Sequence, residues 1–210
     1  MSWADLFERA RAHETDTEAV RQALEDRRDG DPASDGNGDD TAADATAETV
    51  ETTVPDDPRP ARVVADADVL AADLLVGGPA REALDHLRGH SWTALVASDP
   101  LLADAAAVVE RLATPALAVD WRSRVVDLRV PVAHPPGDHP ALASALHGGA
   151  MHVLTFEERL QSAGANAAVR AHVETSIKSP DAFARLFDPE SLYGAVEDGD
   201  YPGPDRDPRA

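Results

Sequence analysis

Short apolar runs alternate with helical patterns through residues 61–190, and this alternation most strongly constrains the fold. Strand-like runs occur at 62–67, 92–98, 128–134, 151–155 and 173–177, with helical patterns between and after them. The alternation predicts parallel strands joined by helices, in a three-layer α/β/α sandwich with a mainly parallel sheet of about five strands. Pro131 places the third run at an edge of the sheet, because proline cannot donate a ladder hydrogen bond.

Turn and capping residues divide the helical patterns. Gly77 and Gly78 separate a helix at 69–76 from one at 79–87. Asp99 is expected to cap the next helix, with Pro100 at its first position. Asp138 is likewise expected to open the helix over 139–148. Further helices are expected near 115–127, from 157 to 164 and from 180 to 187.

Four zones follow from composition. Residues 1–29 form an amphipathic helical segment, with a capping box at Ser2 and Asp5 and a second start signal at Thr15 and Glu18. This segment docks on its own domain or, alternatively, binds a protein partner or a second copy through residues 2–28. Residues 30–60 hold nine acids and one arginine and predict a disordered acidic linker. The α/β domain spans 61–190, and 191–210 form a flexible acidic, proline-rich tail.

The charge balance is strongly acidic, with 39 Asp and Glu against 19 Lys and Arg, a net charge of −20, and Lys178 as the only lysine. This composition is typical of a halophile with molar salt in its cytoplasm, where a Debye length of about 3 Å screens self-repulsion. The acidity therefore does not exclude nucleic acid as a partner. The chain has no cysteine, which excludes disulfides and thiolate chemistry. Without an apolar run of membrane-spanning length or a signal peptide, we expect a soluble cytoplasmic protein and no membrane partner.

Acidic residues lie where the strands are expected to end. Asp66 and Asp68 close the first strand, Asp104 lies one turn into the helix after the second, and Glu157 follows the fourth; Asp138 precedes the helix that leads into the fourth strand. Ligands of open parallel sheets gather at the carboxyl ends of strands. Clustered carboxylates need a compensating cation, and hard oxygen ligands without cysteine favour Mg²⁺ or Mn²⁺.

The whole set resembles the PIN domain, the fold of many metal-dependent ribonucleases. Asp66-Ala-Asp68-Val-Leu resembles the D-x-N-V-L that opens that family, and residues 74–104 are similar to its next stretch. DHPALASALHGGAMHVLTFEERL, residues 138–160, is similar to its D-x-P-x-L…G-A…T-x-D segment, and ETSIKSPDAFARLF to its last strand and P-x-x-F. The resemblance covers about residues 61–188. The sequence departs from the family pattern at three positions. Glu157 stands where the family usually has Asp, Asp104 where it usually has Glu, and Phe156 where it usually has Gly.

The resemblance implies a nuclease that hydrolyses RNA to 5′-phosphate and 3′-hydroxyl ends. Its Mg²⁺ or Mn²⁺ site would be formed by Asp66, Asp104, Asp138 and Glu157 with Asp68 as an additional acid, and Thr155 would orient an acid or a water. Cations near the rim could contact RNA; the candidates are Arg81, Arg88, Arg122, Arg124, Arg159, His134, His139 and His147. Trp121 could stack on a base or pack in the domain.

Three alternatives stay open on the sequence. The first is a degenerate PIN-like domain that acts as a non-catalytic interaction module. The second is a receiver-like signalling domain with Asp99 as phospho-acceptor, which the absence of a Lys-Pro after the fourth strand opposes. The third is an α/β domain whose acids serve only surface hydration.

Overall fold

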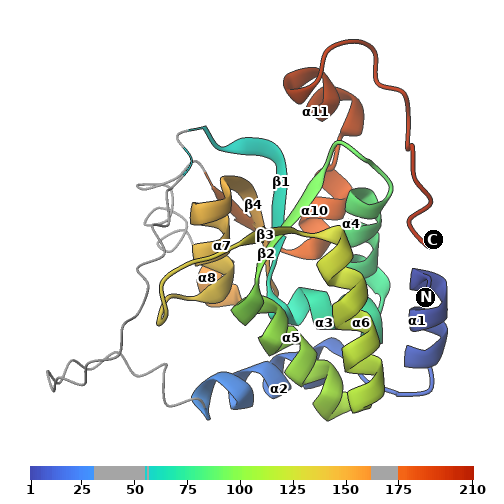
Figure 1. Cartoon of the computed structure of the whole chain (residues 1–210), viewed down its shortest axis with the longest axis vertical. Helices are drawn as coiled ribbons and strands as arrows, with labels where there is room; N and C mark the ends of the chain where they lie inside the picture. The colour runs from blue at the N-terminus through green and yellow to red at the C-terminus, as the bar shows by residue number, and fades with distance from the viewer. Residues whose placement is uncertain (31–54, 56, 162–174) are drawn as a thin grey trace, which may run out of the picture.

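The computed structural model describes residues 1–30, 55, 57–161 and 175–210 and contains one five-stranded parallel sheet (Figure 1). The strands are β1 (Arg59–Ala65), β2 (Ala94–Ser98), β3 (Val130–Val132), β4 (Ala150–Leu154) and β5 (Ser176–Lys178). Their order in the sheet is β3-β2-β1-β4-β5. The expected three-layer α/β/α sandwich with a parallel sheet is confirmed. Most of the expected 30–60 linker lies outside the described residues, as do the start of the run 173–177 and the end of the helix 157–164.

The described helices are α1 (Trp3–Ala10), α2 (Thr17–Asp29), α3 (Ala67–Leu75), α4 (Gly78–Arg88), α5 (Asp99–Leu112), α6 (Pro115–Leu128), α7 (Pro140–Gly148), α8 (Glu158–Gln161), α10 (Pro180–Leu186) and α11 (Pro189–Val196). Most of them lie close to the intervals that the sequence predicts, but α11 was not predicted and α3 begins two residues earlier than expected. Among the described helices, none is long and apolar enough to cross a membrane.

The sheet is built around β1, whose Val63, Val64 and Ala65 are almost completely buried between its neighbours β2 and β4. Such an apolar strand is expected in a parallel sheet covered on both faces. β3 lies at the edge beside β2, with Pro131 opposite Ala97, so the predicted edge position is confirmed.

The end of α7 shows why two glycines follow one another. A Cβ on Gly148 would lie 2.3 Å from a methyl carbon of Val96 on β2, so only glycine permits this helix to pack so closely on the sheet. Gly149 then ends the helix with a φ of 62°, which suits glycine. The pair brings the start of β4 directly beside β1.

Three expected helix starts are shifted. Asp16 rather than Thr15 caps α2, because the Asp16 carboxylate accepts from the Ala19 amide. Ser98 rather than Asp99 caps α5, since its hydroxyl accepts from Leu101 N, and this moves Pro100 to the second helical position. Proline tolerates that place because the first-turn amides have no intrahelical partner.

The expected start of α7 at Asp138 is also wrong. The N-cap is His139, and the helix begins at Pro140, whose ring presets the helical φ. Asp138 is therefore an exposed loop residue. This shift decides which side chain reaches the sheet edge, as described below.

Both N-terminal helices pack on the chain's own domain. The Ser2–Asp5 capping box is present, and α1 buries Trp3, Leu6 and Phe7. α2 runs below α3 and α5 in Figure 1 and packs against both. Its position across the carboxyl end of β1 places it over the edge where the acidic residues were expected.

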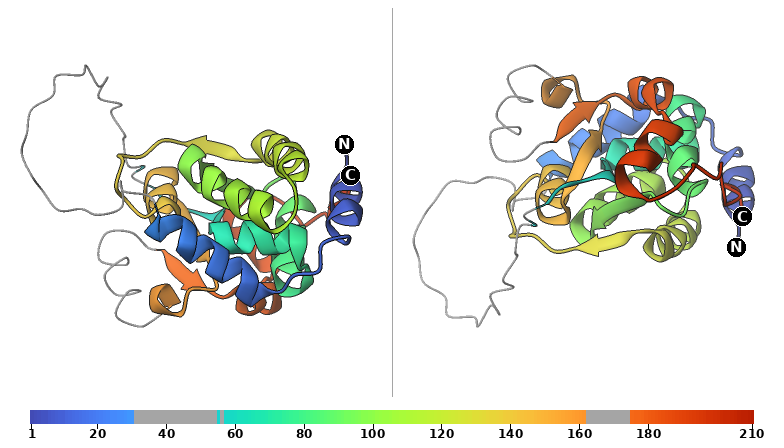
Figure 2. Two further views of the ribbon diagram at one scale, coloured as in Figure 1. Left: turned by 90° about the horizontal axis from the view of Figure 1, so that it is seen from below. Right: turned by 90° about the horizontal axis from the view of Figure 1, so that it is seen from above.

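The two chain ends lie side by side, as both views of Figure 2 show. Ala4 N donates to Arg209 O at 3.0 Å and Trp3 N to Ala210 O at 3.3 Å. The boundary expected at residue 190 falls inside α11, and residues 197–210 form no helix or strand. The last residues thus lie against α1, on a different side of the domain from α2.

Candidate metal centre

Asp66 and Asp68 occupy the carboxyl end of β1, where the chain turns into α3. Asp66 is the N-cap of α3: its Oδ1 accepts from Ala67 N at 2.7 Å, and its own amide donates to Leu154 O on β4 at 2.8 Å. Asp68 lies in the first helical turn and accepts from Val69 N at 2.6 Å. Both carboxylates are buried, at 0% and 2% exposure. The acids are fixed by backbone donors rather than solvated.

The residues after β4 hold these two acids from the other side. The Thr155 hydroxyl lies 3.2 Å from Asp66 Oδ2 and 3.4 Å from Asp68 Oδ2, within donating distance of either. Phe156 N donates to Asp68 Oδ2 at 2.9 Å. Thr155 Oγ1 also accepts from Glu157 N at 3.0 Å, which fixes the start of the turn that carries Glu157. Thr155 thus has the orienting position that the sequence suggested for it.

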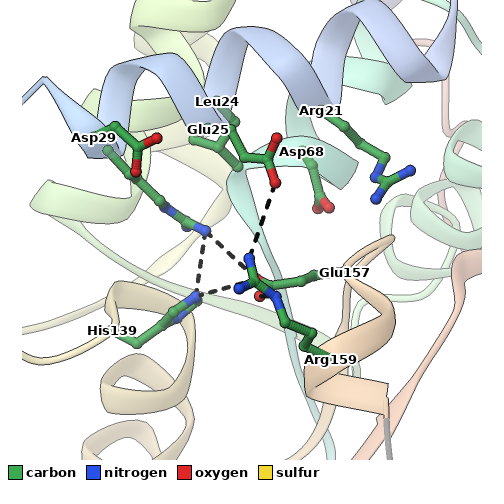
Figure 3. Close-up of a pocket in the computed structure, with 9 residues that line it drawn as sticks. Arg21, Leu24, Glu25, Asp29, Asp68, His139, Glu157 and Arg159 are labelled. Carbon is green, nitrogen blue, oxygen red and sulfur yellow. Dashed lines mark hydrogen bonds and ion pairs between the residues drawn. The ribbon is translucent and has the colours of Figure 1, made fainter.

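A guanidinium group from α2 lies among the acids. Arg28 Nη2 donates to Asp66 Oδ1 at 2.9 Å, Nη1 lies 3.3 Å from His139 Nε2, and Nη1 lies 3.9 Å from Glu157 Oε2. Arg28 Nε lies 3.7 Å from Asp104 Oδ2. Figure 3 shows Glu157 and His139 facing one cavity from opposite sides, with α2 above them. Three acids from three separate segments thus surround one arginine.

Asp104 and Asp138 differ in how they relate to this cluster. Asp104, on α5, is half-buried and lies 3.6 Å from Arg27 Nε as well as near Arg28. Asp138 is exposed and lines a neighbouring cavity of about 420 Å³ together with Asp104 and His139. The next residue, His139, contacts Arg28 and Glu157 in place of Asp138.

The electrostatics of the cluster show an excess of negative charge. Burial, and then the neighbouring Asp66 carboxylate, raises the pKa of Asp68 to about 8. Burial raises the pKa of Asp104, against the opposing effect of Arg28 and Arg27. Burial would lower the pKa of Arg28, but the charges of Asp66, Asp104 and Asp68 outweigh it and raise the pKa. One guanidinium therefore compensates these carboxylates only in part.

His139 acts on Glu157 in the opposite sense. The interaction with His139 is the largest cause of the lowered pKa of Glu157, and the charges of Arg159 and Arg28 add to it. The His139 Nε2 to Glu157 Oε2 distance is 3.9 Å, so we attribute the effect to an ion-pair contact rather than a short hydrogen bond. Glu157 is therefore stabilised as a carboxylate.

Three of these residues could hold a metal ion. Asp66, His139 and Glu157 each offer one ligand atom, and these atoms lie within 4.8 Å of one another. The residues fit a cation in chemistry as well as in spacing, because carboxylate oxygens and imidazole nitrogen are metal ligands and the charges of the acids raise the pKa of Arg28 despite its burial. His139 Nδ1 is buried and has no hydrogen-bond partner among the described residues.

The arginines suggested for RNA contact lie elsewhere in the fold. Arg81 donates to the backbone oxygens of Asp73 and Leu74, and Arg124 donates to Ala210 O. Arg122 Nη2 lies 3.8 Å from Asp99. Arg159 on α8 is the exception, because its Nε lies 3.5 Å from Glu157 Oε1. The other arginines of the acidic cluster, Arg27 and Arg28, come from α2.

Two other residues considered on the sequence have structural surroundings. Trp121 is fully buried, so the packing alternative for its ring is confirmed. Asp99 follows β2, is 70% exposed and pairs with Arg129 Nη2 at 2.6 Å.

Sequence reasoning did not identify Arg28, and it suggested His139 only as a cation that could contact RNA. The Arg27-Arg28 pair ends an amphipathic helix, and basic residues in a last turn are ordinary partners of the helix dipole. Only the docking of α2 over the sheet edge gives Arg28 its place. His139 was not considered as a metal ligand, because Asp138 matched the expected acidic position.

Comparison with known proteins gives one match: residues 57–209 match a family of unknown function, DUF7384. No curated protein and no solved structure matches the chain. The match includes Asp66, Asp68, Asp104, His139 and Glu157, whereas α1 and α2 precede it. Because the match spans more than half of the sequence, the chain belongs to this family of unknown function, DUF7384.

Proposed function

We propose that the protein is a PIN-like, metal-dependent nuclease that hydrolyses RNA phosphodiesters at the edge formed by β1, β4 and α7. The observation that carries the proposal is the convergence of Asp66, His139 and Glu157, whose ligand atoms lie within 4.8 Å of one another. Like-charged carboxylates brought together in a partly buried place destabilise a fold unless a cation compensates them, so their convergence supports a functional site.

The donor set favours Mn²⁺ over Mg²⁺. Imidazole nitrogen suits transition metals, whereas Mg²⁺ prefers oxygen ligands and keeps much of its water. Asp66 and Glu157 would supply oxygens and His139 a nitrogen, and Thr155 would hold Asp66 through its hydroxyl contact at 3.2 Å. When held by these residues, an ion would supply a water molecule of lowered pKa and positive charge against a phosphate.

The surrounding residues can position a nucleic-acid strand. Cavities of about 170 Å³ and 420 Å³ both border Arg28 and His139. Arg159 is 82% exposed beside Glu157 and can contact a phosphate oxygen. Attack of water on phosphorus with cleavage of the P–O3′ bond would leave 5′-phosphate and 3′-hydroxyl ends.

A cleavage assay tests this proposal. The full chain in molar KCl and excess Mn²⁺ is incubated with end-labelled single-stranded RNA, and Glu157→Gln is compared with Glu158→Gln. The two glutamates are adjacent, but Glu158 is exposed at the start of α8 and contributes no ligand atom to the group. We expect cleavage by the wild type and Glu158→Gln, and a loss of roughly a hundredfold or more in Glu157→Gln. Equal cleavage by all three proteins would refute the proposal.

A second function is favoured by one observation. Arg28 already supplies a positive charge at 2.9 Å from Asp66, and such a fixed pair suits a non-catalytic PIN-like interaction module in haloarchaeal-type salt. In that case the wild type and the Arg28→Gln variant would both fail to bind Mn²⁺. Metal binding by either protein favours the nuclease.

A further inference from the structure

The Arg28 side chain contacts the same three residues that could hold a metal ion. Its Nη2 lies 2.9 Å from Asp66 Oδ1, and its Nη1 lies 3.3 Å from His139 Nε2 and 3.9 Å from Glu157 Oε2. The two ends of the guanidinium are therefore directed into the space between the three donors. Among the described residues, these three form the group with metal-binding spacing.

A divalent ion and this guanidinium cannot occupy the space together. An ion bound by oxygen and imidazole ligands lies about 2.0–2.4 Å from each donor atom. With donors that are within 4.8 Å of one another, such an ion would lie within a few ångströms of the Arg28 nitrogens. Two positive charges at that separation in a partly buried site repel strongly. Metal binding therefore requires that Arg28 leave.

The contacts of Arg28 permit the side chain to leave without unfolding α2. Two contacts are within hydrogen-bond distance, with Asp66 at 2.9 Å and with His139 at 3.3 Å. The ion-pair distances to Asp104 and Glu157 are longer, at 3.7 Å and 3.9 Å. The side chain is 23% exposed. α2 itself is held on the domain by Val20, Ala23 and Leu24, which are buried.

The adjoining cavity can receive the displaced guanidinium. This cavity, of about 170 Å³, is bordered by Arg28 and by two acids of the same helix, Glu25 and Asp29, both exposed (Figure 3). Glu25 precedes Arg28 by three residues, a spacing at which helix side chains meet. The withdrawn arginine would thus exchange one carboxylate partner for another.

We propose that Arg28 is an autoinhibitory residue that competes with the divalent metal ion for Asp66, His139 and Glu157. α2 precedes residues 57–209, so the competing side chain comes from outside the family-matched part of the chain. The inference rests on the proposed function, because it requires that the cluster bind a metal. Metal binding and Arg28 withdrawal are then one coupled equilibrium. The apparent metal affinity equals the intrinsic affinity multiplied by the fraction of molecules in which Arg28 is withdrawn.

Titration calorimetry with Mn²⁺ alone, on the full chain in molar KCl, tests the competition. Arg28→Gln is compared with Arg21→Gln, which removes the same charge from the same helix. Arg21 borders the same cavity and pairs with Glu18 at 2.9 Å, so this control reports the general effect of lost positive charge. We expect Mn²⁺ to bind Arg28→Gln about tenfold or more tightly than the wild type and Arg21→Gln.

Arg28→Lys is the second variant, because it keeps the charge but loses the planar two-ended head. We expect an affinity between those of the wild type and Arg28→Gln. Equal Mn²⁺ affinity of the wild type and both Arg28 variants would overturn the competition while the metal centre stands. Absence of Mn²⁺ binding in every protein would overturn the metal centre and the competition with it.

Discussion

Two arginines of this molecule, the buried Arg88 and the half-buried Arg28, lie among carboxylates and differ in how completely they are paired. Arg88 on α4 binds Asp73 through both Nη atoms, at 2.8 Å and 2.9 Å, and Asp85 at 2.7 Å. It is 3% exposed, and its guanidinium lies 4.6 Å from the Trp3 ring centroid. This cluster joins α1 to the domain. The cavity that borders both Asp73 and Arg88 measures only about 10 Å³.

The Arg28 cluster has one short ion pair and several long ones. Its 2.9 Å contact with Asp66 is followed by ion-pair distances of 3.7 Å and 3.9 Å, to Asp104 and Glu157. Asp68 adds a buried carboxyl whose pKa is raised to about 8, chiefly by burial. The two clusters therefore suggest a distinction: a closely paired arginine supports the architecture, whereas an incompletely compensated one marks a site that can exchange its cation.

The largest effect is expected at the closely paired cluster. Asp73→Ala leaves Arg88 buried without its main partner, and breaking such a pair costs about 3–5 kcal/mol in the free energy of unfolding. Chemical denaturation measures this loss. The double variant Asp73→Leu/Arg88→Met removes both charges and should recover most of it. A double variant as unstable as Asp73→Ala would contradict the structural role assigned to the pair.

The next effect concerns the incompletely compensated cluster. Asp66→Asn removes a ligand charge but keeps an oxygen that can accept from Ala67 N, so the cap of α3 is preserved. We expect Mn²⁺ affinity to fall roughly a hundredfold or more, measured by calorimetry. The control Asp99→Asn, at an exposed acid, should bind Mn²⁺ as the wild type does. Unchanged affinity in Asp66→Asn would remove Asp66 from the metal site.

A smaller effect depends on pH. The folded pKa of Asp68, about 8, lies above the unfolded value of 3.8, so the folded protein keeps a proton that the unfolded chain releases. Metal-free stability should therefore fall as pH rises from about 4 to about 8, by at most about 1.4 kcal/mol per pH unit. Asp68→Asn should flatten this slope, whereas the exposed control Asp127→Asn should leave it unchanged in denaturation series at several pH values. A slope that Asp68→Asn does not alter would assign the proton to another group.

The smallest effect is expected at the rim. Arg159 is 82% exposed, and its Nε lies 3.5 Å from Glu157 Oε1. Arg159→Gln should change the free energy of unfolding by no more than about 0.5 kcal/mol, because exposed ion pairs contribute little. Thermal unfolding of Arg159→Gln, measured alongside that of Asp73→Ala, gives the two losses of stability for comparison. A loss above 1 kcal/mol or so would show that the rim is coupled to the fold.

The fold could be predicted because its signals are local. Alternating apolar and helical patterns determined the strand and helix intervals, Gly77 and Gly78 separated α3 from α4, and Pro131 indicated the edge strand. The helix starts were predicted less accurately, because neighbouring polar residues such as Ser98 and Asp99 can each cap a helix. Caps compete within one or two residues, and tertiary contacts decide between them.

The site could be predicted only in part. Asp66, Asp68, Thr155 and Glu157 follow strand ends, and strand ends follow from apolar runs. Arg28 could not be predicted, because its place depends on how α2 docks across the sheet, which no local pattern specifies. His139 replaced Asp138 at the cluster through a one-residue shift in the start of α7.

A crystal structure of the full chain grown with Mn²⁺ tests the central claim most directly, through anomalous scattering from the metal. The account predicts a manganese peak bounded by Asp66, His139 and Glu157, with the Arg28 guanidinium displaced toward Glu25 and Asp29. A crystal in which Mn²⁺ occupies only exposed acids, while Arg28 keeps its contact with Asp66, would contradict the account.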